Sequence, residues 1–145
     1  MRMLDQREVD INARNETGHT LLHIALDKES IKLLISKGAD VNARDAQGMT
    51  PIFNKEINLI ILLVKAGADI RLQSSKGNTA LMWFAYSGYL EGIKYLVSLG
   101  AKIDIKNSDN QTALDIAEQF GHLKVVAYLK SARGENWLKS GGKSK

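Results

Sequence analysis

The chain has 145 residues, of which 44% are apolar, and this is enough for one domain with a packed interior. It contains no cysteine, which excludes a disulfide framework and thiol chemistry and suits the cytoplasm. Its net charge of +4 raises the question of nucleic acid as a partner.

The excess positive charge lies at the end of the chain. Residues 1–129 contain fifteen Lys or Arg and fifteen Asp or Glu, whereas residues 130–145 contain five basic residues and one acidic residue. A domain that binds DNA or RNA carries its basic face on the folded body. The balanced body therefore argues against nucleic-acid binding, and only the basic end keeps this function open as a weak alternative.

The sequence shows no sign of a membrane segment. The first ten residues lack the apolar core of a signal peptide, and the longest apolar run, residues 57–64, is too short to span a bilayer. We therefore expect a soluble protein without a membrane partner. The cytoplasm is its expected location, and delivery into another cell stays open.

The expected helices come in pairs, of which residues 77–101 form the clearest example. Thr79 opens a first apolar run, Gly88 interrupts it, and a second apolar run ends at Gly100. Threonine is a good N-cap, and glycine ends helices in the left-handed conformation. The pattern predicts two short antiparallel helices, each too short to be stable alone in water, so neighbouring copies must supply the core.

Copies of this pattern follow one another along the chain. Residues 9–15 hold only the closing phrase of a copy, and complete copies begin near residues 16, 46, 75 and 108. The first two copies are shortened at the end of the first helix and its turn, which predicts a notch on one edge. The fourth copy lacks the closing phrase and is expected to cap the array, so we expect one domain over residues 1–134 and a basic, flexible tail over residues 135–145.

The copies resemble the ankyrin-repeat family. Their capping threonines are spaced by 30, 29 and 33 positions, and the phrases TLLH (20–23), TPIF (50–53), GADVN (38–42) and TALDIAE (112–118) match the family's signature. The resemblance implies an all-α solenoid of antiparallel helix pairs with β-hairpin tips that project to one side. It also implies that the chain binds other proteins.

Nine residues occupy positions that the repeat explains as caps, turns or helix ends. They are Thr20, Thr50, Thr79, Thr112, His23, Gly38, Gly67, Gly100 and His122. Phe84 stands where the family usually places alanine. A phenyl ring at this position needs extra room between neighbouring first helices. Our hypothesis is that Phe84 fills the space left by the shortened second copy.

No constellation in the sequence indicates catalysis. His19 is the one histidine that the repeat does not explain, and no acid or histidine spacing around it suits a metal. The phrase GGKS (141–144) lacks the strand, the earlier glycine and the following helix of a phosphate-binding loop. We expect no enzyme, no cofactor, no metal and no small-molecule substrate.

What remains is a binding surface. The resemblance places the hairpin tips and the exposed side of the first helices on one concave strip, and aromatic residues and Arg are the usual anchors of interfaces. The predicted partner-binding residues are Trp83, Tyr86, Phe120, Arg14, Arg44, His19, Met49, Lys76, Asn78 and Gln111. Packing rather than binding stays open for Trp83 and Phe120, and Arg14 and Arg44 form either a short basic row or ordinary solvated tips.

The sequence thus predicts a monomeric, non-catalytic interaction or scaffold module for a protein partner of unknown identity. One form of this role is an inhibitor or immunity-type partner of an enzyme or toxin. The alternative is a regulatory or targeting fragment of a larger enzyme or channel.

Overall fold

The structure, a computed structural model, describes residues 10–139 apart from the side chains of residue 54 and residues 135–139. Its regular elements are all helical, and no strand forms within these residues, which confirms the all-α prediction. The elements are α2 (Leu21–Ile24), α3 (Lys28–Ser36), η1 (Pro51–Asn54), α4 (Ile57–Lys65), α5 (Ala80–Ser87), α6 (Leu90–Ser98), α7 (Ala113–Gln119) and α8 (Leu123–Lys139).

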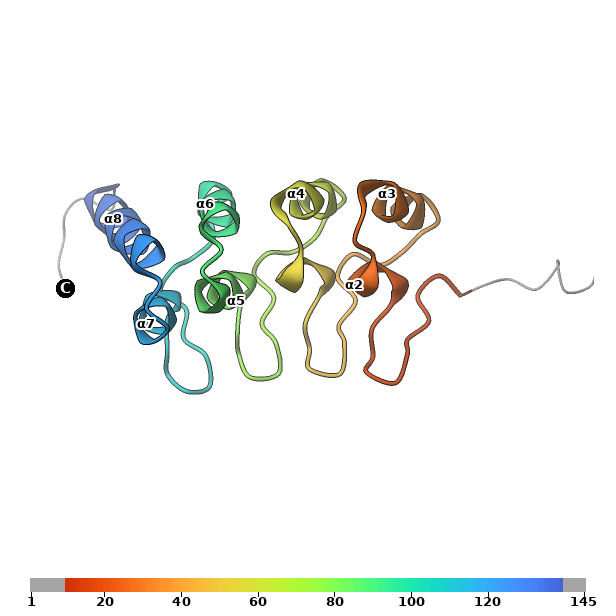
Figure 1. The fold of residues 1–145 in the computed structure, drawn as a ribbon, viewed down its shortest axis with the longest axis horizontal. Coiled ribbons are helices and arrows are strands. Elements are labelled where there is room, and N and C mark those ends of the chain that lie inside the picture. Colours follow the sequence, from red (N-terminus) through yellow and green to blue (C-terminus); the bar gives the residue numbers. More distant parts are fainter. Residues whose placement is uncertain (1–9, 140–145) are drawn as a thin grey trace, which may run out of the picture.

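The elements form four helix pairs that stand side by side in chain order (Figure 1). The first members, α2, η1, α5 and α7, lie in one row, and the second members, α3, α4, α6 and α8, lie in the other. The long loops that precede the first members all project to the same side (Figure 1). This is the solenoid of helix pairs that the family resemblance implies.

The ends of the helices follow from threonine and glycine. Thr20, Thr50, Thr79 and Thr112 all stand as buried N-caps with extended backbone. The hydroxyl groups of Thr79 and Thr112 each accept a hydrogen bond of 3.2 Å from the backbone three residues on. Gly38, Gly67 and Gly100 follow the second helices with φ of 92°, 104° and 93°, the left-handed conformation that stops a helix.

The first helices differ in length, in keeping with the shortened copies. Helix α2 has four residues and η1 is a four-residue 3-10 helix that starts at Pro51, whereas α5 has eight residues. Proline suits the first helical position because it has no N–H to lose there. The two shortest first helices therefore stand next to each other in the first two repeats.

The projecting loops turn tightly at their tips, and no strand forms in them. In the second loop the N–H of Asp45 donates to the carbonyl of Met49 at 2.9 Å, and the Asp45 carboxylate accepts from the N–H groups of Gln47 and Met49, also at 2.9 Å. Asn15, Ser74 and Asn107 make the equivalent bonds in the other loops. Side-chain oxygens thus satisfy backbone donors that a strand would otherwise pair.

Successive loops are joined by backbone hydrogen bonds. Ala46 donates to Thr17 at 3.0 Å, and Ser75 donates to Gln47 at 2.9 Å. The approach is close enough that a Cβ atom at Gly48, whose φ is +78°, would lie 2.7 Å from the nitrogen of Ser75. The loops therefore form one stacked surface rather than separate arms.

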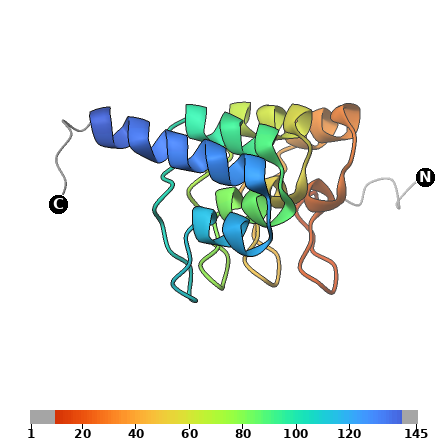
Figure 2. The ribbon, with the colours of Figure 1, turned by 60° about the vertical axis from the view of Figure 1, so that its left-hand side comes forward.

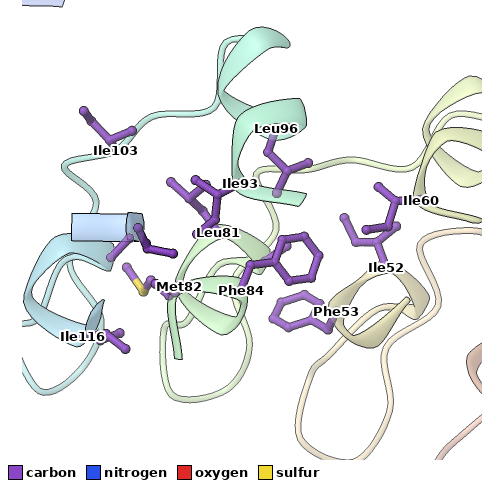
Figure 3. Packing of buried hydrophobic residues seen from close by; sticks show 14 of the residues in the cluster. Ile52, Phe53, Ile60, Leu81, Met82, Phe84, Ile93, Leu96, Ile103 and Ile116 are labelled. Atoms are coloured by element: carbon purple, nitrogen blue, oxygen red, sulfur yellow. The ribbon is translucent and has the colours of Figure 1, made fainter. Parts of the chain in front are cut away.

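The interior is filled by side chains from both rows of helices. Phe84 is only 1% exposed, and its ring faces that of Phe53 across the junction between α5 and η1 (Figure 3). The edge of the Tyr89 ring packs against Phe84 with centroids 5.5 Å apart. Gly92 makes room for the ring, since a Cβ atom there would lie 2.9 Å from Phe84.

The C-terminal helix extends farther than expected. Helix α8 runs on to Lys139, past Gly134, where the sequence analysis ends the folded domain, and Figure 2 shows it reaching beyond the other helices. The part of the expected tail from residue 135 to residue 139 is thus helical. Residues 1–9 and 140–145 lie outside the described residues.

Candidate functional site

An open groove of about 640 Å³ runs between the third and fourth loops and the helices that follow them. We call it the tip groove. It is lined by Lys76, Asn78, Met82, Trp83, Tyr86, Asn107, Asp109, Gln111, Ile116, Gln119 and Phe120. Its volume falls in the range of ligand-binding pockets in proteins.

Three aromatic side chains line one side of the tip groove as a continuous strip. The ring centroids of Trp83 and Tyr86 are 5.6 Å apart, and those of Tyr86 and Phe120 are 4.6 Å apart at an interplanar angle of 84°. Trp83 and Tyr86 stand three positions apart on α5, so they lie on the same helix face. Tyr86 and Phe120 are each 47% exposed, so this aromatic strip presents ring surface to solvent.

Side-chain amides form the polar part of the tip groove. The amide of Asn107 donates to Asn78 at 2.8 Å and to Gln111 at 3.3 Å, and Gln111 donates to Gln119 at 2.8 Å. This row links the loop of one repeat to the loop and helix of the next. Lys76 and Asp109 also line the groove as exposed side chains of opposite charge.

Six of the ten predicted partner-binding residues come together in the tip groove. They are Trp83, Tyr86, Phe120, Lys76, Asn78 and Gln111. The predicted residues do not include Asn107, although the spacing of the repeats makes it the equivalent of Ser74, which makes the same turn bonds in the third loop. The other four predicted residues belong to the first two loops.

Arg14 and Arg44 serve the stacking of the loops instead of forming a free basic row. The guanidinium of Arg44 donates to the carbonyl of Gln73 in the next loop at 2.7 Å. The guanidinium of Arg14 donates in the same way to the carbonyl of Arg44. An arginine side chain is long enough to reach the next loop, which is why both side chains are occupied within the array.

His19 also makes contacts within the array. Its Nε2 atom lies 3.1 Å from the carboxylate of Asp45, and its ring stacks on that of His23 with centroids 5.3 Å apart. His23 in turn donates from Nε2 to the carbonyl of Met49 at 2.9 Å and accepts at Nδ1 from Thr20. Burial lowers the pKa of His23, so its ring is a neutral link between two repeats.

His122 holds the backbone beneath the aromatic strip. Its Nε2 atom donates to the carbonyl of Tyr86 at 2.9 Å. Gly88 allows this approach, because a Cβ atom there would lie 2.6 Å from the His122 ring. The fourth repeat therefore helps to position Tyr86 in the third.

A second groove, of about 420 Å³, lies at the notch between the second and third repeats. We call it the turn groove. It is lined by Phe53, Lys55, Glu56, Trp83, Phe84, Ser87, Gly88 and Tyr89. The Phe84 ring is buried against the interior, and the outer part of the notch stays open as this groove. The hypothesis that Phe84 fills the notch therefore applies only to the inner part.

Lys55 is the functional candidate that the sequence analysis missed. The residue is 3% exposed, and its ammonium group donates to the carbonyl of His23. Burial lowers the pKa of Lys55 to about 8. A signal was present, because Lys55 follows its capping threonine by the same five positions that separate Phe84 from Thr79, so a charged residue stands in a core position.

Two further kinds of site, a metal centre and a membrane-spanning helix, were considered for the described residues. Its residues contain no group of three or more His, Asp or Glu side chains that could hold a metal ion. None of the helices in residues 10–139 combines the length and apolarity needed to cross a bilayer.

Several larger proteins are similar to this chain over about 95 residues. The B-cell lymphoma 3 protein homolog of Mus musculus is 35% identical over 61% of this chain and 21% of its own length. The tyrosine-protein kinase HTK16 of Hydra vulgaris is 35% identical over 60% of this chain and 13% of its own. The human transient receptor potential cation channel subfamily A member 1 is 32% identical over 59% of this chain and 8% of its own.

Two family models also match the chain. The model for three copies of ankyrin repeats matches residues 52–139, and the model for a single ankyrin repeat matches residues 17–46. Such repeats are generally protein-interaction modules. Because the first match covers more than half of the chain, the protein belongs to the ankyrin-repeat family.

Proposed function

We propose that this chain binds a partner protein through the tip groove and has no catalytic activity of its own. The observation that carries the proposal is the aromatic strip of Trp83, Tyr86 and Phe120, of which two rings are 47% exposed. Exposed aromatic surface costs hydration free energy that a partner recovers on binding. Aromatic side chains are also the most frequent anchors of protein interfaces.

The polar part of the tip groove supports a protein ligand rather than a purely apolar one. The amide groups of Asn78, Gln111 and Gln119 offer donors and acceptors that match peptide backbone. Lys76 and Asp109 supply one charge of each sign from neighbouring loops. Such a rim orients a partner, whereas the aromatic strip supplies most of the binding free energy.

The experiment compares capture of proteins from the native cell by the parent chain and by two variants. Tyr86→Ala with Phe120→Ala removes the exposed part of the strip and should lower capture of the specific partner at least about tenfold. The matched control is Leu33→Ala on α3, which removes a side chain that is 55% exposed on the other row of helices. Equal capture by both variants would show that the partner binds at a surface other than the tip groove.

One form of the proposal is that the chain inhibits its partner. Addition of the purified chain to the captured partner should then lower the partner's activity, and the Tyr86→Ala, Phe120→Ala variant should not. If the partner's activity is unchanged, the chain is a binder of that partner but not its inhibitor. We also propose that the chain is monomeric and cytoplasmic, which light scattering and cell fractionation test directly.

A second candidate is a regulatory or targeting role within a larger protein. It is favoured by the similarity to segments of a tyrosine-protein kinase and of a cation channel, of which this chain spans only 13% and 8%. An antibody raised against the chain would then detect a much larger protein in the native cell. The weaker alternative, nucleic-acid binding, predicts retention on DNA or RNA that is lost when residues 139–145 are deleted.

A further inference from the structure

Ionisable side chains gather where the first repeat meets the second. The ammonium group of Lys55, which is 3% exposed, donates to the carbonyl of His23. The ring of His23 donates from Nε2 to the carbonyl of Met49 at 2.9 Å. The Nε2 atom of His19 lies 3.1 Å from the carboxylate of Asp45 in the second loop. All of these contacts join the first repeat to the second, and we call His19, His23, Asp45 and Lys55 the histidine cluster.

The bonds of His23 require its ring to be neutral. Its Nδ1 atom accepts a hydrogen bond from the N–H of Thr20 at 3.1 Å, and Thr20 is the buried N-cap of α2. A proton on Nδ1 removes this acceptor. The hydroxyl of Thr20, 3.0 Å from Nδ1, can accept the added proton, but the N–H of Thr20 then has no acceptor in the described part of the chain. A buried N–H without a partner destabilises a helix end, and α2 has only four residues.

The rest of the histidine cluster makes a positive charge on His23 unfavourable. The rings of His19 and His23 stack with their centroids 5.3 Å apart. Burial is the main cause that lowers the pKa of His23; the bond to Met49 and the charge of Asp45 oppose it, whereas the charges of His19 and Lys55 add to it. The one carboxylate among the groups that face the ring already contacts His19.

The later interfaces between repeats lack this arrangement. The residues at the position of His23 in the second, third and fourth repeats are Phe53, Met82 and Asp115. Phenylalanine and methionine do not titrate. The bond from the backbone of Thr112 holds the pKa of Asp115 below its ordinary value of 3.8, so this carboxylate stays charged in mild acid.

His122 joins the third repeat to the fourth without the same sensitivity. Its Nε2 atom donates to the carbonyl of Tyr86, and a protonated ring keeps this N–H. Among the described residues no donor is bonded to its Nδ1 atom, so a proton there breaks no hydrogen bond. Mild acid should therefore act at the first interface and spare the tip groove.

We propose that mild acid loosens the first repeat from the second through protonation of His23 against His19 and Lys55, while the third and fourth repeats stay packed. The histidine cluster is then a pH-sensitive switch within one interface of the array. Because the loosened state takes up a proton that the packed state resists, its population should rise by up to about tenfold for each pH unit below the ordinary histidine value of 6.5. This switch is separate from partner binding at the tip groove.

The test is native-state hydrogen exchange of the full chain, followed by NMR between about pH 5 and pH 8. The rates are expressed as protection factors, which removes the pH dependence of exchange itself. A released repeat cannot keep its short helices, so protection of Ile31 and Leu34 in α3 should fall below pH 6.5 by up to about tenfold per pH unit. Protection of Ile93 and Leu96 in α6 should stay constant. An equal decline in both helices, or constant protection in α3, would overturn the proposal.

Two glutamine variants provide the matched comparison. His23→Gln keeps a donor and an acceptor but cannot be protonated, so the fall of protection in α3 should disappear. His122→Gln removes a histidine from a later interface and should keep the fall. A fall that persists in His23→Gln would rule out His23 as the switch.

Where His23→Gln fails to fold, the parent chain decides. The ring signals of His23, followed by NMR, should titrate below pH 6.5 and over the same pH range in which α3 loses protection. A His23 ring that titrates at pH 6.5 or above, or that stays neutral while protection falls, would contradict the proposal.

Discussion

The ammonium group of Lys55 donates a hydrogen bond to the backbone carbonyl of His23, a residue 32 positions earlier and one repeat away. Lys55 reaches α2 from the end of η1, where a longer first helix would otherwise continue. Lys55 is 3% exposed, and burial lowers its pKa to about 8 because a charged amine is disfavoured away from water. This relationship links the stability of the array to pH.

We expect the free energy of unfolding to rise as the pH rises from about 8 to the ordinary lysine value of 10.5. In this range the unfolded chain still holds the proton that the folded chain has released, so raising the pH favours the folded state. The gain is at most about 3 kcal/mol. Below pH 8 both states are protonated and the cost of burying the charge is fully present. Urea denaturation across this range measures it.

The matched controls are two lysine-to-methionine variants. Lys55→Met should abolish this increase in stability, whereas Lys76→Met, at an exposed position, should keep it. An increase that persists in Lys55→Met would assign the pH dependence to another group.

Phe84→Ala should lower the free energy of unfolding by about 3–5 kcal/mol, because the ring is buried and its removal leaves a cavity between α5 and η1. Tyr86→Ala, two positions further along the same helix, removes a ring that is 47% exposed and should cost no more than about 1.5 kcal/mol. Thermal or chemical denaturation compares the two. Similar losses would contradict the burial of Phe84.

Gly48→Ala should destabilise the chain more than Gly67→Ala. Both positions have positive φ, which costs an alanine about 1–2 kcal/mol. At position 48 the new Cβ atom would also lie 2.7 Å from the nitrogen of Ser75, whereas no atom lies within 4 Å at position 67. Equal losses of stability in the two variants would show that the close contact between the second and third loops contributes nothing to stability.

Asn42→Ala should cost about 1–2 kcal/mol, because Asn42 joins two repeats through its amide. Its oxygen accepts from the N–H of Asp69 at 2.7 Å, and its nitrogen donates to the carbonyl of Gly67 at 3.2 Å. Asn58→Ala, at an exposed position of α4, is the control and should leave stability unchanged or slightly raised. An equally large loss of stability in Asn58→Ala would show that the hydrogen bonds of Asn42 between repeats are not the cause.

Much of the candidate site could be predicted because it repeats a local pattern. Trp83 and Tyr86 share a helix face by spacing alone, and the predicted Lys76, Asn78 and Gln111 follow from equivalent loop positions. Their meeting with Phe120 depends on how closely the third and fourth repeats stack, which His122 and Gly88 control through contacts between repeats. Arg14, Arg44 and His19 were predicted as binders, and the contact that each makes with a neighbouring loop could not be read from the spacing.

The sequence by itself determined the helix pairs, because a capping threonine and a terminal glycine act on the backbone within a few residues of themselves. It also indicated the notch, since the spacing from Thr50 to Gly67 is too short for two full helices. Only the tertiary structure decided where Lys55 points and which loop carbonyls the arginines reach, because these bonds join residues about thirty positions apart. Long side chains have many partners within reach along a sequence, and only packing selects one.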